Sequence, residues 1–340
     1  MVKVYPPDFQ MPTHHGLDLS LSSCILKKNI KNMKQLNIAT LDFHHWTQGG
    51  VEQKNFFLSE IGTALSGHGF FFLKNSGLDL KLLEEGTKAW KKFLTLPEEE
   101  RMNYVFNELK NQVGYTPHGV EKGEFAAIAD TKCFWQTNPD YEMPKMSKGV
   151  EEFSKIDLKV FYEFERVGRE LLRAITITID LPIDFFDKKI GNSVLRNIFY
   201  PANANPMSDD TAVARGGNII AMCASRHTDI NFITLLEALE KGLQLRHGGK
   251  WYEITITEPG LIIVNCGDML EHFTAGLYKS GEHRVVCEPN KERFSRPFFL
   301  HVKRDVIIIP PEIKSFDREK YPFTTAGEYL DFRLDQIGLG

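Results

Sequence analysis

The chain has 340 residues, a formal net charge of −4 and a hydrophobic fraction of 42%, with 25 phenylalanines. This length suits one large or two ordinary domains, and the apolar content is enough for a substantial core. The mild charge gives no electrostatic reason to expect a nucleic acid or an anionic membrane as a partner. No run of 18 apolar residues is present, so we expect no membrane-spanning segment.

The five cysteines are odd in number, scattered, and never spaced as Cys-x-x-Cys. This pattern argues against a disulfide framework, a structural zinc site and a thioredoxin-type motif. The N-terminal stretch has no apolar core of the kind that marks a signal peptide. We therefore expect a cytoplasmic protein in a reducing setting, present as a monomer or weak homodimer.

The first half of the chain is expected to be mainly helical. Residues 1–35 are polar and irregular and are expected to form a lead without regular structure. Asp79 is a candidate N-cap, and Pro97 followed by three glutamates is typical of the start of a short helix. Apolar spacing predicts helices at 51–67, after Asp79, after Pro97 and at 150–180, strands at 36–42, 70–73 and 130–136, and a short amphipathic piece at 183–190.

From residue 192 the pattern changes to short segments rich in Ile, Val, Leu and Phe, separated by Gly, Pro, Asn and Asp. Eight such strands predict a sandwich or barrel such as a jelly roll. Thr325 and Glu328 form a capping box before a last helix. We expect a mainly β fold with flanking helices, in one domain over 36–340: a helix-rich part at 36–190, a jelly-roll core at 191–310 and a C-terminal helix at 311–340. The predicted strands are 194–200, 222–229, 232–236, 243–246, 251–256, 261–265, 283–288 and 294–302.

His227-Thr-Asp229 is a candidate metal-binding pair. Residues two apart on a strand point to the same face, so one nitrogen and one carboxylate oxygen could reach the same ion. Among 11 histidines, however, one His-x-Asp pair is weak support. The alternative is a strand-end histidine that bonds to a nearby carboxylate.

A third ligand has to come from elsewhere, and the candidates are His247, His272, His283 and His301. His272 lies four residues after Asp268 and could share a helical face with it. We favour His283, because it begins a predicted strand and strand ends at a barrel mouth are usual places for pocket ligands.

Arg293 and Ser295 lie two residues apart on a predicted strand and could together hold a carboxylate. The alternative is a surface arginine beside a serine. Alternation does not decide between them, because Phe294, Phe298 and Phe299 make both sides of the strand apolar. Tyr200 is a candidate for a further hydroxyl, or an aromatic core residue whose OH finds a partner.

These motifs, taken in order, resemble the iron(II)- and 2-oxoglutarate-dependent oxygenases, in the branch that includes isopenicillin N synthase. The likeness covers about residues 36–340, and its last motif resembles bacterial members of that branch. The matching motifs are Gly69-Phe-Phe-Phe-Leu-Lys-Asn-Ser-Gly77, Leu96-Pro97-Glu-Glu-Glu100, Gly114-Tyr115, Asp130-Thr-Lys-Cys-Phe-Trp135, Thr234-Leu-Leu236, Gly242-Leu-Gln244, Trp251, Pro259-Gly260, Asn265-Cys-Gly-Asp268, Tyr278-Lys-Ser280, His283-Arg-Val285, Arg293-Phe-Ser-Arg-Pro-Phe-Phe299 and Thr325-Ala-Gly-Glu-Tyr-Leu330.

The resemblance implies that His227, Asp229 and His283 bind Fe(II). It also implies that Arg293 and Ser295, with Tyr200 assisting, bind the distal carboxylate of 2-oxoglutarate. Oxidative decarboxylation to succinate and CO₂ would then accompany oxidation of a small organic substrate by O₂. Ascorbate would be an accessory reductant.

Two features depart from the family pattern. Ile198 stands where many plant members have an asparagine two residues before the tyrosine, and the segment 203–225 is longer than usual. Three other functions are weighed. An oxidase like isopenicillin N synthase would not use 2-oxoglutarate, and a non-catalytic jelly-roll protein would only bind a ligand. A zinc hydrolase is disfavoured because no glutamate lies beside the ligands in a zinc-protease pattern.

Overall fold

The computed structural model describes residues 36–121, 130–143, 145–202, 214–215, 218–219, 221–237, 239–256, 258–287, 290–309, 317–337 and 339. The predicted irregular lead and much of the 203–225 segment lie outside the described residues. Within these ranges no helix combines the length and apolar character needed to cross a membrane.

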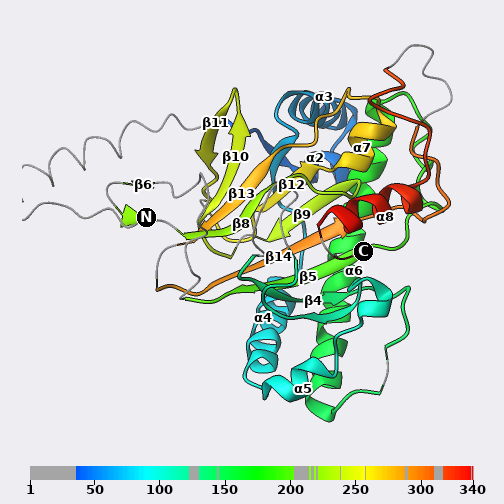
Figure 1. Ribbon diagram of the computed structural model, residues 1–340. Coiled ribbons are helices and arrows are strands. Elements are labelled where there is room, and N and C mark those ends of the chain that lie inside the picture. Colours follow the sequence, from blue (N-terminus) through cyan, green and yellow to red (C-terminus); the bar gives the residue numbers. More distant parts are fainter. Residues whose placement is uncertain are drawn as a thin grey trace, which may run out of the picture.

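Strands from both halves of the chain build one large sheet (Figure 1). The sheet is antiparallel except for the parallel pair β1–β2 at one edge. Its strands run in the order β1 (Thr40–Asp42), β2 (Phe70–Lys74), β12 (Ile262–Cys266), β9 (Ile233–Glu237), β14 (Arg293–Leu300), β5 (Val194–Tyr200), β4 (Cys133–Thr137) and β3 (Gly114–Thr116).

A second, antiparallel sheet forms the other wall of the barrel. Its order is β11 (Lys250–Glu253), β10 (Leu243–His247), β13 (His283–Cys287) and β8 (Ala221–His227), and a separate pair joins β6 (Ala214–Arg215) to β7 (Asn218–Ile219). The fold is the predicted jelly roll with flanking helices. The eight strands expected after residue 192 are all present, with ends shifted by up to three residues.

Helices cover the outer face of the large sheet, and one more helix lies near the C-terminal end of the chain. They are α2 (Phe43–Thr47), α3 (Val51–Gly67), α4 (Leu80–Leu94), α5 (Glu98–Met102), α6 (Lys148–Thr178), α7 (Asp268–Phe273) and α8 (Ala326–Gln336), with a 3₁₀ turn at Asn107–Leu109. In Figure 1 the long α6, in green, runs behind the large sheet. It contacts β4, β9 and β14 as well as α3 and α4.

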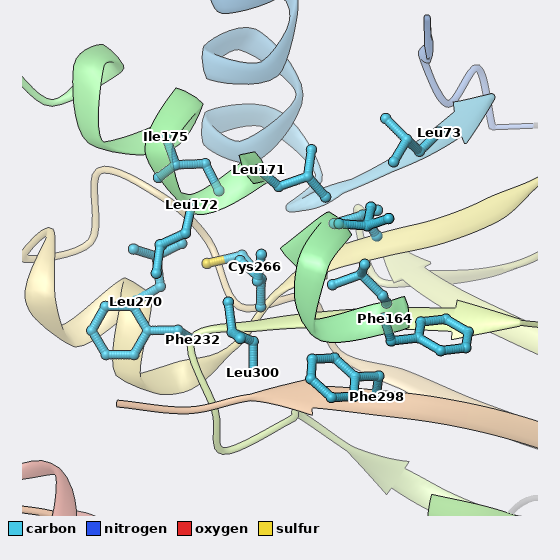
Figure 2. Packing of buried hydrophobic residues seen from close by; sticks show 14 of the residues in the cluster. Leu73, Phe164, Leu171, Leu172, Ile175, Phe232, Cys266, Leu270, Phe298 and Leu300 are labelled. Carbon is cyan, nitrogen blue, oxygen red and sulfur yellow. The ribbon is translucent and has the colours of Figure 1, made fainter. Parts of the chain in front are cut away.

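The main core lies between α6 and the large sheet (Figure 2). Phe164 of α6 stacks on Phe298 of β14 with ring centroids 5.9 Å apart, and Leu171 and Leu300 continue the contact. Each of these side chains is fully buried. Burying one such side chain contributes about 1.5–3 kcal/mol, so this contact fixes β14 firmly under α6.

Local sequence signals explain where several helices begin. The Asp79 carboxylate accepts hydrogen bonds from the backbone N–H groups of Lys81 and Leu82, which confirms the predicted N-cap of α4. Thr325 and Glu328 form the predicted capping box of α8. These caps satisfy backbone donors that a helix leaves open at its first turn.

One helix, α2, was not predicted from the sequence. The amphipathic piece expected at 183–190 forms turns that end in a β-bridge. The short α2 depends on Asp42, whose side chain accepts from the His44 N–H group.

The expectation that the cysteines form no disulfide was wrong. Cys223 of β8 and Cys287 of β13 are bonded, with their Cα atoms 5.9 Å apart. These two strands are neighbours in the small sheet, so residues 64 positions apart come into bonding distance. Spacing along the chain does not reveal such a cross-strand pair. Among the described cysteines, Cys133 and Cys266 are free and buried.

Candidate active site

A cavity of about 140 Å³ lies between the two sheets. Its lining comes from strands of both sheets, from the segment before β4 and from α8, through Leu330 and Leu334. His227, Asp229 and His283 lie along one side of this cavity. The barrel therefore places polar groups from distant parts of the chain around one cavity.

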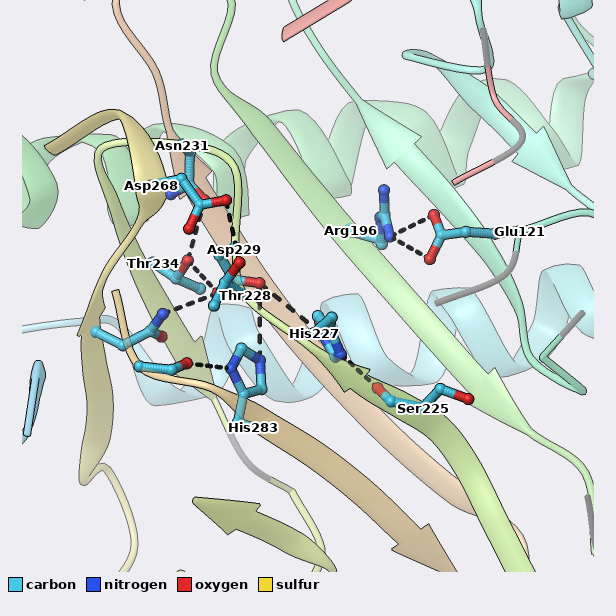
Figure 3. Close-up of polar contacts among 12 residues, drawn as sticks. Glu121, Arg196, Ser225, His227, Thr228, Asp229, Asn231, Thr234, Asp268 and His283 are labelled. Atoms are coloured by element: carbon cyan, nitrogen blue, oxygen red, sulfur yellow. Dashed lines mark hydrogen bonds and ion pairs between the residues drawn. The ribbon is translucent and has the colours of Figure 1, made fainter. Parts of the chain in front are cut away.

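The three predicted metal ligands come together in the structure (Figure 3). His227 ends β8 and His283 begins β13, and the two residues are directly opposite each other in the sheet. Their Nε2 atoms lie 4.0 Å and 3.7 Å from the Asp229 Oδ1 atom, respectively. One ligand atom from each of the three residues lies within 4.8 Å of the others. Asp229 lies two residues beyond the end of β8, so a turn and not the strand alternation brings it to the site.

Backbone carbonyl groups orient both imidazole rings. His227 Nδ1 lies 2.7 Å from the Ser225 carbonyl oxygen, and His283 Nδ1 lies 3.0 Å from that of Gly281. An Nδ1–H that donates to a carbonyl leaves the Nε2 lone pair free for a metal ion. Burial, and next the nearby His283, lowers the pKa of His227 to about 3, so this ring is neutral and ready to bind a cation.

The Asp229 carboxylate is held by its second oxygen. Asp229 Oδ2 accepts a hydrogen bond of 2.6 Å from the Thr234 hydroxyl and one of 2.9 Å from the Asn265 amide. Burial raises the pKa of Asp229, but His283, His227 and these two hydrogen bonds together lower it below its usual value. The carboxylate is therefore ionised, and Oδ1 is directed toward the two histidines. Two imidazoles and one carboxylate form the facial donor set typical of non-haem Fe(II).

Arg293 and Ser295 face the cavity. Every second residue of β14 lines it, namely Arg293, Ser295, Pro297 and Phe299, and this settles the orientation that the sequence left open. The Arg293 guanidinium is buried, and its Nε donates to the Lys241 carbonyl at 2.9 Å. Its Nη1 has no hydrogen-bond partner among the described residues. A buried cationic donor without a partner, beside a hydroxyl, fits a carboxylate.

The other candidate histidines are not part of the group. His247 lies beside His68, with the two Nδ1 atoms 3.2 Å apart. His272 lies on α7, where its Nε2 is 2.7 Å from the Pro322 carbonyl oxygen. His301 lines the cavity but does not belong to the metal-binding cluster found among the described residues.

Comparisons with known proteins agree with this geometry. The model of the 2OG-Fe(II) oxygenase superfamily matches residues 191–302, and the model of the non-haem dioxygenase in morphine synthesis N-terminal region matches residues 38–156. Azadirone synthase LFS of Melia azedarach is 30% identical over 301 residues, which span 79% of this chain and 85% of that protein. The chain belongs to the 2OG-Fe(II) oxygenase superfamily.

Further relatives of the oxygenase point the same way. Isopenicillin N synthase of Streptomyces jumonjinensis is 26% identical, over 89% of this chain and 96% of that protein. A full-length protein of Neurospora crassa, solved in complex with alpha-KG, matches with a TM-score of 0.75 at 25% identity, over 89% of this chain and 97% of that one. The oxygenase depends on Fe(II) and 2-oxoglutarate. The His-Asp-His donor set fits the metal, and Arg293 Nη1, which has no partner among the described residues, fits a carboxylate of 2-oxoglutarate.

The departure at Ile198 has a structural counterpart in the oxygenase. Ile198 lines the cavity opposite Ser295, at the place where many plant members of the family have an asparagine. The neighbouring Asn197 does not replace it, because its side chain bonds Asp157 and Arg296 on the other face of the sheet. Tyr200 is opposite Arg293, whose guanidinium lies 5.1 Å from the centre of the tyrosine ring.

Sequence reasoning missed a group of charged residues in the cavity. We call Glu121, Asp130, Lys132 and Arg196 the charged wall. Lys132 Nζ lies 2.6 Å from Glu121 Oε1 and 2.7 Å from Asp130 Oδ2, and Arg196 Nη1 lies 2.9 Å from Glu121 Oε2. Figure 3 shows the pair of Arg196 and Glu121 apart from the metal-binding residues. Glu121, Asp130 and Lys132 lie outside the strands, before β4, and only Arg196 lies in a strand. Period-two alternation in β5, which sets Arg196 beside the inward Ile198 and Tyr200, could therefore have indicated only this one of them.

Proposed function

We propose that His227, Asp229 and His283 hold Fe(II), and that Arg293 and Ser295 bind the distal carboxylate of 2-oxoglutarate. The oxygenase then oxidises a small organic molecule that enters the same cavity. Written for hydroxylation, the balance is R–H + 2-oxoglutarate + O₂ → R–OH + succinate + CO₂. The bound metal and cosubstrate supply the activation of O₂, and the chain supplies binding, orientation and exclusion of water.

The observation that carries this proposal is the buried Arg293. Its Nη1 has no hydrogen-bond partner in the described part of the chain, and a buried charge of this kind is costly unless an anion meets it. Burial lowers the pKa of Arg293 below its usual value, and a bound carboxylate would oppose that effect. Ser295, buried two residues further along the same face, offers a hydroxyl to the same anion. The ring of Tyr200 supports the guanidinium from the neighbouring strand.

Arg293→Met tests the role of this residue. We expect the concentration of 2-oxoglutarate needed for half-maximal turnover to rise at least tenfold, because a charge-assisted hydrogen bond is lost. Arg173→Met, which removes an arginine paired with Asp187 on the outside of α6, is the matched control and leaves that concentration unchanged. An unaltered 2-oxoglutarate requirement in Arg293→Met would contradict the assignment.

A second measurement separates this function from that of an oxidase which draws all electrons from its substrate. This comparison is needed because isopenicillin N synthase is among the relatives. O₂ consumption is followed with 2-oxoglutarate present and absent. We expect consumption to require 2-oxoglutarate and to release succinate in equal amounts. Consumption that proceeds at the same rate without 2-oxoglutarate would overturn the proposal.

A further inference from the structure

The charged wall is a closed set of ion pairs inside the cavity. Glu121 lies between Lys132 and Arg196, with one carboxylate oxygen close to each, and Asp130 pairs with the other side of Lys132. Arg196 is further held by Gln136, whose Oε1 accepts from Nε at 2.8 Å, and by the ring of Phe134. Two anions and two cations therefore cancel, and each is already in contact with an opposite charge.

The remaining charges that line the cavity also have counterparts. Among the described lining residues, Arg333 pairs with Asp268, Asp229 faces the metal site and Arg293 faces the proposed carboxylate. His301 adds no charge near neutral pH, because burial lowers its pKa to about 4. Once Fe(II) and 2-oxoglutarate are bound, the charges of ion, cosubstrate, Asp229 and Arg293 sum to zero. No unmatched charge in the described lining is left for the substrate.

A substrate with an ionised group at the wall would therefore be buried without a counter-charge. It would have to break a buried ion pair to gain one, and either course is unfavourable. An uncharged polar group meets no such penalty, because it can add hydrogen bonds to charged groups that are already neutralised. The charged wall thus selects against ions without repelling polar molecules.

Asn231 is an independent indication that the substrate carries polar groups. It lines the cavity and is 1% exposed, two residues after the metal ligand Asp229. One end of its amide faces the Thr234 hydroxyl at 3.2 Å, while Nδ2 at the other end has no hydrogen-bond partner among the described residues. A buried amide of this kind requires a partner, and a substrate in the cavity can provide one.

We propose that the primary substrate is a small molecule without an ionised group at the wall, recognised through uncharged amide, carbonyl or hydroxyl groups by Asn231 and the charged wall. This inference rests on the proposed function, since it concerns the same cavity. The charged wall and Asn231 then determine specificity, and none of these residues is a metal ligand or one of the carboxylate-binding pair Arg293 and Ser295. The competing explanation is that the wall only fastens the segment before β4 to β5.

Matched probes of one shape and three charges test the proposal. Benzamide, benzoate and benzamidinium, and the corresponding naphthalene compounds, are measured by anaerobic equilibrium dialysis against the enzyme with Fe(II) and saturating 2-oxoglutarate. Saturation keeps the carboxylates from competing at Arg293. We expect the carboxamide of each set to bind at least tenfold more tightly than either ion. Tightest binding of the carboxylate or the amidinium would overturn the inference.

Two variants with opposite expected effects separate recognition from a structural role. Glu121→Gln leaves the wall with one excess positive charge and should raise the carboxylate-to-carboxamide affinity ratio at least tenfold. Lys132→Met leaves an excess negative charge and should raise the amidinium-to-carboxamide ratio instead. Glu165→Gln, from a Glu–Arg pair on α6, is the control and leaves both ratios unchanged.

The outcomes are distinguishable even if one variant folds poorly. The two variants are expected to shift the preference between charged and uncharged probes in opposite directions. Either variant alone therefore distinguishes recognition from a structural role, provided that circular dichroism shows it to be folded. Equal loss of affinity for all three probes would mean that the wall is only structural, and would overturn the inference. Failure of the proposed function is seen separately, as absence of a 2-oxoglutarate-dependent absorption band when Fe(II) is added, before any probe is present.

Discussion

The support of Asp229 by Thr234 offers the sharpest test of how the chain prepares its metal site. Thr234 and Asn265 both donate to Asp229 Oδ2, at 2.6 Å and 2.9 Å, and so leave Oδ1 for the ion. Thr234→Val removes the shorter of these bonds with little change in volume. Asn265 alone then holds Oδ2, so the carboxylate is less firmly oriented.

The expected cost follows from the strength of that bond. A hydrogen bond to a charged group contributes about 1.5–3 kcal/mol, and loss of a residue that orients a metal ligand typically weakens metal binding 10–100-fold. Since Asn265 still holds Oδ2 in the variant, we expect the lower end, about tenfold weaker Fe(II) binding. The protein should remain folded, because Asp229 keeps its other partners.

Anaerobic Fe(II) titration in the presence of 2-oxoglutarate measures the effect through the absorption band of the complex. Thr176→Val is the matched control, because it removes a buried threonine hydroxyl that bonds only the Leu172 carbonyl within α6. The control should bind Fe(II) as the wild type does. Affinity of Thr234→Val within twofold of the wild type would refute the idea that this hydroxyl orients the ligand.

Three further predictions concern stability. Arg296→Met should lower the free energy of unfolding by about 3–5 kcal/mol in urea titrations, because the lost guanidinium is fully buried and its removal takes the partner, at 2.7 Å, from partly buried Glu237. A loss below about 1 kcal/mol would contradict this. Burial raises the pKa of Glu121, but Arg196 and Lys132 outweigh it and lower this pKa to about 2. The ionised carboxylate therefore contributes about 3 kcal/mol to the free energy of unfolding. This contribution is complete above pH 4.5 and is lost as the pH falls toward 2. Unfolding experiments should therefore show that the difference in free energy of unfolding between wild type and Glu121→Gln becomes smaller below pH 4.5. A difference that grows below pH 4.5 would contradict this prediction. The Cys223–Cys287 bond closes a separation of 64 residues, so Cys223→Ala should lower the free energy of unfolding by about 4 kcal/mol in oxidising buffer and by far less with dithiothreitol. An equal decrease in both buffers would exclude a stabilising role for the disulfide.

The sequence was most informative where one residue pattern has one structural outcome. Short apolar runs bounded by Gly, Pro and Asn predicted the strands of the barrel, and the Asp79 and Thr325 caps predicted helix starts, because these signals are local. The grouping of His227, Asp229 and His283 depended on the resemblance to a family as well. His-x-Asp alone did not select His283 over His301, which also lines the cavity.

What the sequence did not reveal was set by contacts between distant strands. Cys223 and Cys287 meet only because β8 and β13 are neighbours, and no spacing rule encodes that pairing. Glu121 reaches Arg196 across 75 positions, so its role could not be distinguished from that of a surface glutamate. The inward orientation of Arg293 likewise needed the register of β14 against β5, since apolar residues occupy both faces of that strand.

The charged wall and the metal ligands come from different parts of the chain, and this affects how the enzyme could acquire a new substrate. Three of the four residues of the charged wall, Glu121, Asp130 and Lys132, lie before β4, whereas the metal ligands come from the end of β8, the residues just after it and the start of β13. The charge presented to the substrate can therefore change by substitution at these three positions, with the three metal ligands left intact. Exchanging these residues between relatives is a direct route to altered selectivity, because they are far in sequence from the residues that hold the metal.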